Sequence, residues 1–527
     1  MSVSRYVPHP TSLLPSFAAP STTPADQRSR RKPKIHPTSY LDGLRGLAAF
    51  SVFAYHYTDY NHKFFLPAWG SNPPEEGSSL LQLPYVRLLY AGTPMVHIFF
   101  VISGFALAYR PLRCLHERNA AGGTLPPPAV CVRDREKEKE VEKDAVSPTK
   151  GMGGSFYVTS PSQKAIAKCH NILASSALRR PIRLFGPPLA LTLIDVVLVR
   201  LGFMSGFLRH HDTLWEQLTD WFTDAVTAVT WPWGWDDGPH SRYNPHLWTI
   251  PIEFSHSMLL FLLLIVVSRL RTSGLRRIVM TLVMCYSLLF CARWAAFEFV
   301  SGALLADFHL ENDAREKEKD KTESKLILGC AGVLNVLCPT FLLAFAGFIV
   351  SWPSRPDDIT PTFAYLRSTA PPAYTHEDRE HGRDFWYALA ALSFVWSAGK
   401  LRSLQNLLEG RVPQYLGKIS FALYILQHPI LNTCEHHVLG APYHAATEED
   451  PERPGWGVRG LTGESTPLQR TICWFTGLAV LGSILIWLAD LFTRAIDAPC
   501  VKLARTLETF VFLQEDRGGE HTLPAKW

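Results

Sequence analysis

The sequence predicts an all-α, polytopic membrane protein built as a bundle of about ten transmembrane helices. Of its 527 residues, 47% are hydrophobic and only 19% are charged. The apolar residues gather in runs of about 15 to 25, which can cross or nearly cross a hydrocarbon core of about 30 Å. The charged residues gather between these runs instead of alternating with them along amphipathic faces. This pattern excludes a single soluble globule, a collagen, a coiled coil and a disulfide-rich secreted scaffold.

Ten apolar runs are expected to form the helices of the bundle. In chain order they are residues 41–57, 91–109, 184–201, 247–267, 278–292, 294–308, 326–350, 385–398, 419–438 and 471–492. The fifth, sixth and eighth runs are short, since a helix of about 15 residues reaches only about 22 Å. These three therefore need snorkelling ends, local thinning of the bilayer or a re-entrant arrangement.

The polar segments between the runs define the expected domains and topology. Residues 1–39 are expected to be a disordered cytoplasmic tail, 40–493 the membrane domain and 494–527 a cytoplasmic C-terminal tail. Within the membrane domain, 115–170 and 309–325 are expected to be disordered cytoplasmic loops because both contain runs of charge. Lys and Arg favour the segments on the side of the termini by about three to one. The chain is therefore expected to be an integral, multi-pass membrane protein with both termini in the cytoplasm.

Composition also limits the partners and cofactors. The net charge is only +5, and the basic residues do not interleave with aromatic residues as a single-strand groove requires, so no nucleic-acid partner is expected. The ten cysteines include no C-x-x-C pair, which argues against a zinc site or a disulfide framework. The first 34 residues lack a continuous apolar stretch, so they are not expected to be a cleaved signal peptide. No metal or permanently bound cofactor is expected.

Ionisable residues inside the apolar runs are the best indicators of function, because each is costly in a membrane unless it is paired or lines a cavity. The first run carries Arg45 and His56. Eleven residues of helix separate them, which places both on one face about 16.5 Å apart along the axis. A fixed cation suits a phosphate, and a histidine suits proton transfer. The alternative is an Asp42–Arg45 pair with an interfacial histidine.

Two further segments carry candidate site residues. The segment LRRPIRL precedes the third run, and its arginines, including Arg180 and Arg183, form a possible phosphate clamp at a cytoplasmic helix end. Ordinary flanking residues on the cytoplasmic side would look the same. In the fourth run, Glu253 is expected near the outer end of its helix with His56 as a partner, although it could also be a capping or packing carboxylate.

Two other features favour structural roles. Ser103 and Gly104 interrupt a bulky helix and predict close approach of another helix, not a nucleophilic serine, because no G-x-S-x-G elbow surrounds them. Trp231, Trp233 and Trp235 precede two aspartates outside the fourth run. They are typical of an interfacial aromatic belt, and an acceptor-binding platform is the bolder alternative.

Taken in order, these segments resemble the acyltransferase 3 family of multi-span membrane O-acyltransferases, from about residue 40 to residue 492. The matching text is YLDGLRGLAAFSVFAYH, FFVISGFAL, RRPIRL, LWTIPIEF, FEFVSGALLA and GKISFALYILQHP. By this resemblance, His56 is the essential histidine, Arg45 its partner on the donor side, Glu253 the fourth-span carboxylate, and Arg180 and Arg183 contacts of the donor.

One position departs from the family. Where the family usually has histidine, this chain has Gln427, and His428 follows one residue later. That shift turns the side chain by about 100° around the helix, which weakens a catalytic role for His428.

The resemblance implies a membrane-bound enzyme that takes an acyl group, often acetyl, from cytosolic acyl-CoA and passes it to a hydroxyl. The expected acceptor is a carbohydrate, a lipid or a specialised metabolite. The expected partners are acyl-CoA, this hydroxyl-bearing acceptor and the lipid bilayer. A proton-coupled transporter is the first alternative, since intramembrane His, Glu and Arg also serve proton coupling. The sequence has no inverted repeat to support it. A non-catalytic membrane scaffold is the second alternative.

Overall fold

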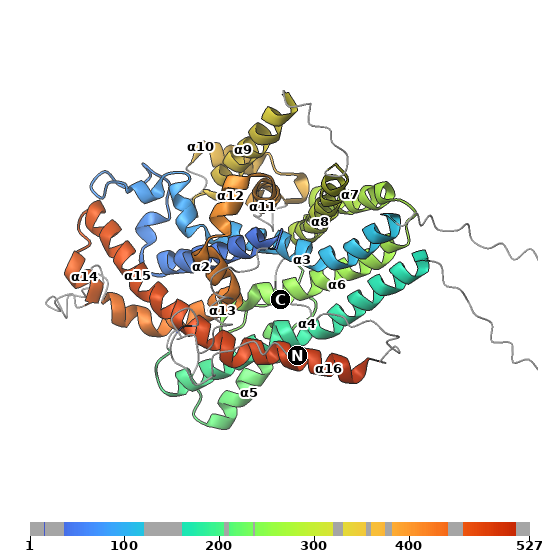
Figure 1. Ribbon diagram of the computed structural model, residues 1–527. Helices are drawn as coiled ribbons and strands as arrows, with labels where there is room; N and C mark the ends of the chain where they lie inside the picture. The colour runs from blue at the N-terminus through green and yellow to red at the C-terminus, as the bar shows by residue number, and fades with distance from the viewer. Residues whose placement is uncertain are drawn as a thin grey trace, which may run out of the picture.

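The computed structural model describes residue 15 and residues 36–120, 161–204, 210–235, 238–319, 330–354, 360–374, 382–440 and 457–512. Every regular element in these ranges is a helix, so the all-α prediction is confirmed for this part of the chain (Figure 1). All ten apolar runs fall in helices, apart from a few terminal residues and, in the seventh run, residues 326–329, which lie outside the described ranges.

Most of the ten helices that contain these runs are longer than the runs themselves. They are α2 (Ser39–Asn61), α3 (Gly92–Ala120), α4 (Pro161–Arg200), α6 (Thr249–Ser268), α7 (Ser273–Leu289), α8 (Trp294–Lys319), α9 (Cys330–Val350), α11 (Gly382–Lys400), α13 (Arg411–Leu439) and α15 (Pro467–Phe492). Shorter helices connect or extend them: α5 (Leu214–Asp224), α10 (Pro361–Ser368), α12 (Arg402–Leu408), α14 (Gly457–Thr462) and α16 (Ala498–Val511).

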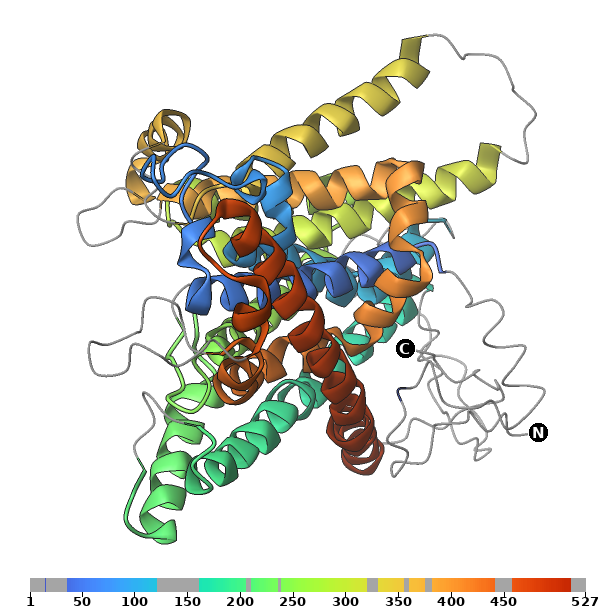
Figure 2. The ribbon, with the colours of Figure 1, turned by 90° about the vertical axis from the view of Figure 1, so that its left-hand side faces the viewer.

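Four stretches of the described chain are long and apolar enough to cross a membrane. They are Gly92–Glu117, Gln163–Arg200, Pro245–Ser268 and Pro467–Val511. The helix α2 does not reach that apolarity, and its position explains why. It runs through the middle of the assembly, where other helices cover it (Figure 2). A helix enclosed in this way needs no uniformly apolar surface, because its polar groups meet protein and not lipid.

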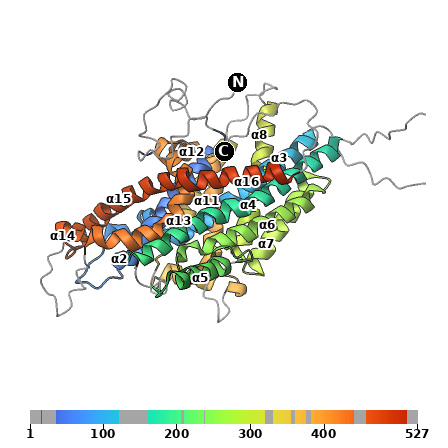
Figure 3. The same cartoon turned by 90° about the horizontal axis from the view of Figure 1, so that it is seen from below.

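Two expected loop boundaries are wrong. α3 continues to Ala120 and α4 begins at Pro161, so both ends of the expected 115–170 loop are helical. α8 continues to Lys319, where an Arg315–Glu311 pair one turn apart supports a helix that was expected to end near residue 308. The expected C-terminal tail begins with the π-helix η10 (Thr493–Asp497) and α16, which prolong α15 into a rod along α4 (Figure 3).

α2 and α13 lie parallel and in register, although they are far apart in the sequence. Arg45 of α2 donates a hydrogen bond to the carbonyl of Gly417, 372 residues later. The helices can approach this closely because glycines lie at the contact. A Cβ atom on Gly46 would lie 2.3 Å from the Gly417 nitrogen, and one on Gly417 would lie 2.2 Å from the Asp42 carbonyl oxygen. This contact fixes the position of α2, which carries Arg45 and His56.

A second glycine contact joins α3 and α8. A Cβ on Gly104 would lie 2.1 Å from the carbonyl oxygen of Phe299, and one on Gly302 would lie 2.1 Å from that of Val101. The close approach that the Ser103–Gly104 pair predicts is therefore confirmed. Small residues at such a crossing let two backbones touch, which is the usual solution for helices packed within a membrane.

Replacing Gly302 by alanine should destabilise the fold by about 1–3 kcal/mol, because the new methyl group meets backbone that cannot move aside without separating α3 from α8. Gly274→Ala is the matched control. Gly274 lies in the first turn of α7, and its nearest neighbour would be 3.9 Å from the added carbon. Unfolding in mixed detergent micelles measures both variants. Equal stability of the two would show that the α3–α8 contact tolerates separation.

Candidate active site

Three histidines from three separate parts of the chain meet beside the C-terminal half of α2. The His56 ring stacks on the His246 ring, with centroids 3.7 Å apart and planes 23° apart. The His428 ring meets His246 edge-on at 5.2 Å. His246 and His428 are buried, whereas His56 is half-buried. Among the described residues, no group of His, Cys, Asp or Glu side chains has the arrangement of a metal site.

Several polar atoms in this cluster lack a hydrogen-bond partner among the described residues. They are Nδ1 of His246, Nδ1 of His428 and both polar atoms of the fully buried Gln427 side chain. Buried polar groups are nearly always paired, so a group of orphaned ones indicates a place where another molecule completes the bonds. The cluster therefore has the character of a binding site for a polar molecule.

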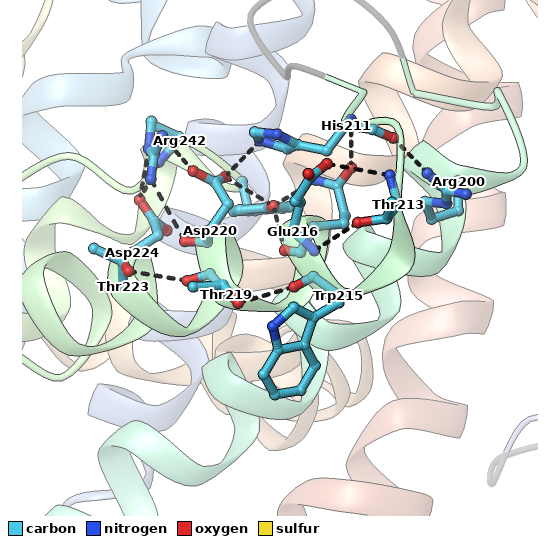
Figure 4. Close-up of polar contacts among 12 residues, drawn as sticks. Arg200, His211, Thr213, Trp215, Glu216, Thr219, Asp220, Thr223, Asp224 and Arg242 are labelled. Atoms are coloured by element: carbon cyan, nitrogen blue, oxygen red, sulfur yellow. Dashed lines mark hydrogen bonds and ion pairs between the residues drawn. The ribbon is translucent and has the colours of Figure 1, made fainter.

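α5 and the segment after it hold the chain that leads to His246 (Figure 4). Thr213 and Glu216 form a capping box that starts α5, because each side chain binds the backbone nitrogen of the other. The Arg242 guanidinium then pairs with Asp220 at 2.8 Å. Ser241 donates to Asp224 at 2.5 Å, so the segment is tied to α5 at consecutive residues.

The next two residues continue this attachment. Tyr243 donates to Asp220 at 3.0 Å and accepts from Gln217 at 2.7 Å. Burial raises the pKa of Tyr243 to about 12, so the phenol stays neutral and keeps its proton for this bond. Asn244 donates to the carbonyl of Ile425 on α13 at 3.0 Å. The segment thus bridges α5 and α13 immediately before His246.

α13 also fixes the His246 backbone directly. The Tyr424 hydroxyl donates to the His246 carbonyl at 2.6 Å and lies 2.8 Å from the Thr249 hydroxyl. The ring of His246 is therefore placed by its neighbours before any ligand arrives. A preorganised ring of this kind can hold the orientation of His56, on which it stacks.

The other end of the α2 face carries Arg45. It lies 3.2 Å from Asp42, so the ion pair that the spacing allowed is present. The Arg45 side chain is nevertheless 42% exposed, and its Nε–H has no partner among the described residues. α2 is one uninterrupted helix, so the separation of about 16.5 Å between Arg45 and His56 along its axis stands. Both residues contact α13 or the histidines beside it.

The expected partner of Glu253 is wrong. Its carboxylate accepts a hydrogen bond from Arg180, and no hydrogen bond joins it to His56 among the described residues. The reason lies in α4, which continues through Pro181, Pro187 and Pro188. The RRPIRL segment therefore lies in the middle of a 40-residue helix instead of at its start. Arg180 reaches the depth of Glu253, and the two form an ion pair between α4 and α6.

Arg183 lies one turn from Arg180 and is exposed. It makes no ion pair with any residue that the structure describes, although the charges of Arg45, Arg179 and Asp497 act on it. Arg179 pairs with Glu508 of α16 at 3.2 Å. Arg45, Arg180 and Arg183 thus belong to one cationic group, which we call the arginine cluster. Arg45 and Arg180 each form an ion pair, whereas Arg183 forms none with a described residue.

Sequence reasoning missed a deeply buried ion pair. His97 of α3 lies 2.5 Å from Glu298 of α8, and its other ring nitrogen lies 4.0 Å from Asp384 of α11. Both members of the first pair are almost fully buried. The rule that ionisable residues in apolar runs deserve notice would have found Glu298 in FEFVSGALLA. His246 directly precedes the segment LWTIPIEF, but nothing in its spacing indicates contact with a residue 190 positions earlier.

A family model described as an acyltransferase domain, Acyl_transf_3, matches residues 38–126 and 154–491. The curated protein "O-acetyltransferase PaAT-1" of Phomopsis amygdali is 27% identical, over 97% of this chain and 90% of its own length. "Acyltransferase R4" of a Phoma species is 22% identical and "Acyltransferase clz18" of Cochliobolus lunatus 21% identical, each over 74% of this chain and 81% of its own length. No solved structure matches the chain.

Proposed function

We propose, because the chain belongs to the acyltransferase 3 family and is an acyltransferase, that it is membrane-bound and moves an acyl group from cytosolic acyl-CoA to a hydroxyl. Acetyl is the favoured group, since a relative that spans nearly the whole chain is named an O-acetyltransferase. The acceptor is a carbohydrate, a lipid or a specialised metabolite. The observation that carries the proposal is the α2 face, which joins the arginine cluster at one end to the histidine cluster at the other.

The arrangement in the membrane forms part of the proposal. The ten helices that contain the predicted runs form the bundle, with both termini in the cytoplasm. Four of the stretches have the length and apolarity of spans. Of the others, α2 is shielded by neighbouring helices, among them α13 and α3. Arg45 then lies toward the cytoplasm, where acyl-CoA is present, and His56 lies toward the outer end of the same helix.

The donor binds first at the arginine cluster. The exposed guanidinium of Arg183 and the partly exposed Arg45 hold the phosphates of CoA, because guanidinium groups match phosphate oxygens in charge and geometry. Glu253 keeps Arg180 in place beside them through the ion pair. The pantetheine arm then extends along α2, and the distance of about 16.5 Å brings the thioester toward His56.

The chemistry takes place at His56. A ring nitrogen accepts the proton of the acceptor hydroxyl while the hydroxyl oxygen attacks the thioester carbonyl. The carbon–sulfur bond then breaks, CoA leaves as its thiolate, and the proton on His56 neutralises the leaving sulfur. His246 orients His56 through the stack. Two imidazolium ions 3.7 Å apart would repel each other, so this contact favours the neutral ring that a base requires.

Purified protein in nanodiscs tests the proposal. We expect labelled acetyl-CoA to yield free CoA and a labelled ester only when an acceptor is present. Metabolites extracted from a deletion strain, which should contain a compound lighter by one acyl group, supply that acceptor. Uptake or efflux of a solute in sealed vesicles, without consumption of acyl-CoA, would instead favour the transporter alternative.

Arg183→Gln should raise the KM for acyl-CoA by about ten-fold or more while kcat changes little, because the side chain binds the donor phosphates but lies away from the reacting atoms. Arg113→Gln is the control. Arg113 is also exposed, but it pairs with Glu117 on α3 at 3.1 Å. The KM of the Arg113→Gln variant for acyl-CoA should stay at the wild-type value. An unchanged KM for Arg183→Gln would remove Arg183 from the donor site.

A further inference from the structure

A small polar cavity lies next to His56 and plays no part in the scheme above. Its volume is about 90 Å³, several times what one water molecule needs. It lies where the C-terminal half of α2, the start of α3, the end of α9 and the start of α11 meet. Its lining includes Arg87 of the 3-10 helix η3 (Val86–Tyr90), Arg383 of α11 and the indole of Trp352.

Tyr55 separates this cavity from the histidine cluster. The Tyr55 ring lines the cavity and lies 5.2 Å from the His56 ring, in edge contact. Gly92 at the start of α3 leaves room for it, since a Cβ there would lie 2.2 Å from the Tyr55 ring. A molecule that occupied the cavity and passed Tyr55 would therefore reach His56.

The lining is rich in hydrogen-bond donors and in positive charge. Arg87 is almost fully buried, and its guanidinium donates to the carbonyls of Leu66 and Pro67, which are neutral acceptors and leave its charge without a carboxylate among the described residues. Burial lowers the pKa of Arg87, the mark of a cation that water no longer solvates. Among the described lining residues there is no acidic side chain. Two guanidinium groups around one cavity favour an anion between them.

Trp352 gives an independent indication. Its side chain is 3% exposed, and its indole N–H has no acceptor among the described residues. An indole N–H can only donate, and buried tryptophans normally find a partner for it. An oxygen atom of a bound anion would satisfy this donor and match the charge of Arg87.

Building on the proposed function, we infer that this cavity binds a carboxylate group of the acceptor and so selects acceptors that carry both an acid and a hydroxyl. The cavity is large enough for a carboxylate and a few more atoms, but not for an entire acceptor. The rest of the molecule extends past Tyr55 and presents its hydroxyl to His56. Arg383 and Trp352 are specificity-determining residues in this arrangement.

The test uses 4-(hydroxymethyl)benzoate and its methyl ester as matched probes. The two differ at one end, where the first carries a charged carboxylate and the second a neutral methyl ester. Full-length protein in nanodiscs is titrated with each probe by calorimetry. We expect the affinity for the acid to be at least about ten-fold higher than the affinity for the ester. Arg383→Gln should remove most of this preference, and Arg383→Lys should restore part of it.

Two further variants separate the possible explanations. Trp352→Phe keeps the ring but removes the N–H, so it should weaken binding of the acid without changing that of the ester. His56→Ala should leave binding of the acid intact while abolishing ester formation. Equal binding of acid and ester to the wild-type protein, or no binding of the acid at millimolar concentration, would overturn the inference. Binding of the acid without any transfer would support the cavity and contradict the proposed function instead.

Discussion

Replacing His56 by alanine is expected to lower kcat for acyl transfer by about 100- to 10,000-fold, the usual contribution of a general base. The reason is that His246 and His428, the histidines that cluster with His56, are buried, whereas His56 is half-buried. The KM for acyl-CoA should change little, because the donor phosphates bind about 16.5 Å away. Steady-state kinetics on purified protein measures both constants.

The matched control for this prediction is His240→Ala. His240 is exposed and lies in the segment before Ser241, with its ring 6.4 Å from that of Trp248 and outside the histidine cluster. Its loss should leave kcat unchanged. Thermal unfolding of both variants shows whether the fold survives. A folded His56→Ala protein with wild-type turnover would eliminate the base mechanism and leave the scaffold or transport alternatives.

The second large effect is expected at the ion pair between Arg180 and Glu253. Either single substitution, Arg180→Met or Glu253→Gln, should lower the free energy of unfolding by about 3 kcal/mol, because it leaves the other residue with a mostly buried charge and no ion-pair partner. The side chains are 16% and 17% exposed, which places the cost at the lower end for buried pairs. The double variant should be more stable than the sum of the single losses predicts.

A double-mutant cycle measured by unfolding in mixed micelles checks this coupling. The control cycle uses Arg113 and Glu117, which lie one turn apart on α3 and are 62% and 51% exposed. That pair should couple by only about 0.3–0.5 kcal/mol. If the losses at Arg180 and Glu253 simply added, the contact would be incidental and each residue would act alone.

The helices themselves were predictable, and the reason is physical. Long apolar runs satisfy their backbone groups in a membrane by forming helices, so each of the ten predicted segments lies in a helix over its described length, apart from a few terminal residues. Their ends were less predictable. α3, α8 and the helix that follows α15 continue into charged sequence, because ion pairs one turn apart or between helices stabilise polar turns that hydropathy alone treats as loop.

Some residues of the candidate site were predictable from the sequence and others were not. Arg45 and His56 lie on one helix, so the 3.6-residue period was enough to place them on a common face. Glu253 depends on contacts between helices, and its partner was misjudged because the RRPIRL segment was expected at a cytoplasmic helix end and not inside α4. Prolines are tolerated inside helices of this kind, where neighbouring groups satisfy the freed carbonyls.

His428 illustrates the limit of reading one helix by itself. Its displacement by one residue from the family position weakened the case for it, yet its ring lies 5.2 Å from that of His246. Gln427, at the family position, is fully buried in the same region. The rotation of α13 is set by the contact of Gly417 with Asp42, which no property of the segment GKISFALYILQHP could reveal. The orientation of α13 thus depends on the helix it packs against, α2.

The parallel pairing of α2 with α13 has a consequence for biosynthesis. Gly417 leaves the ribosome 372 residues after Arg45. Until then the glycine surface of α2 lacks its permanent neighbour, and the arginine and histidine on it are not yet enclosed. Translation must therefore be nearly finished before catalysis can begin, and a nascent chain that stops short of α13 should be held by membrane chaperones or degraded instead of yielding a partly active enzyme.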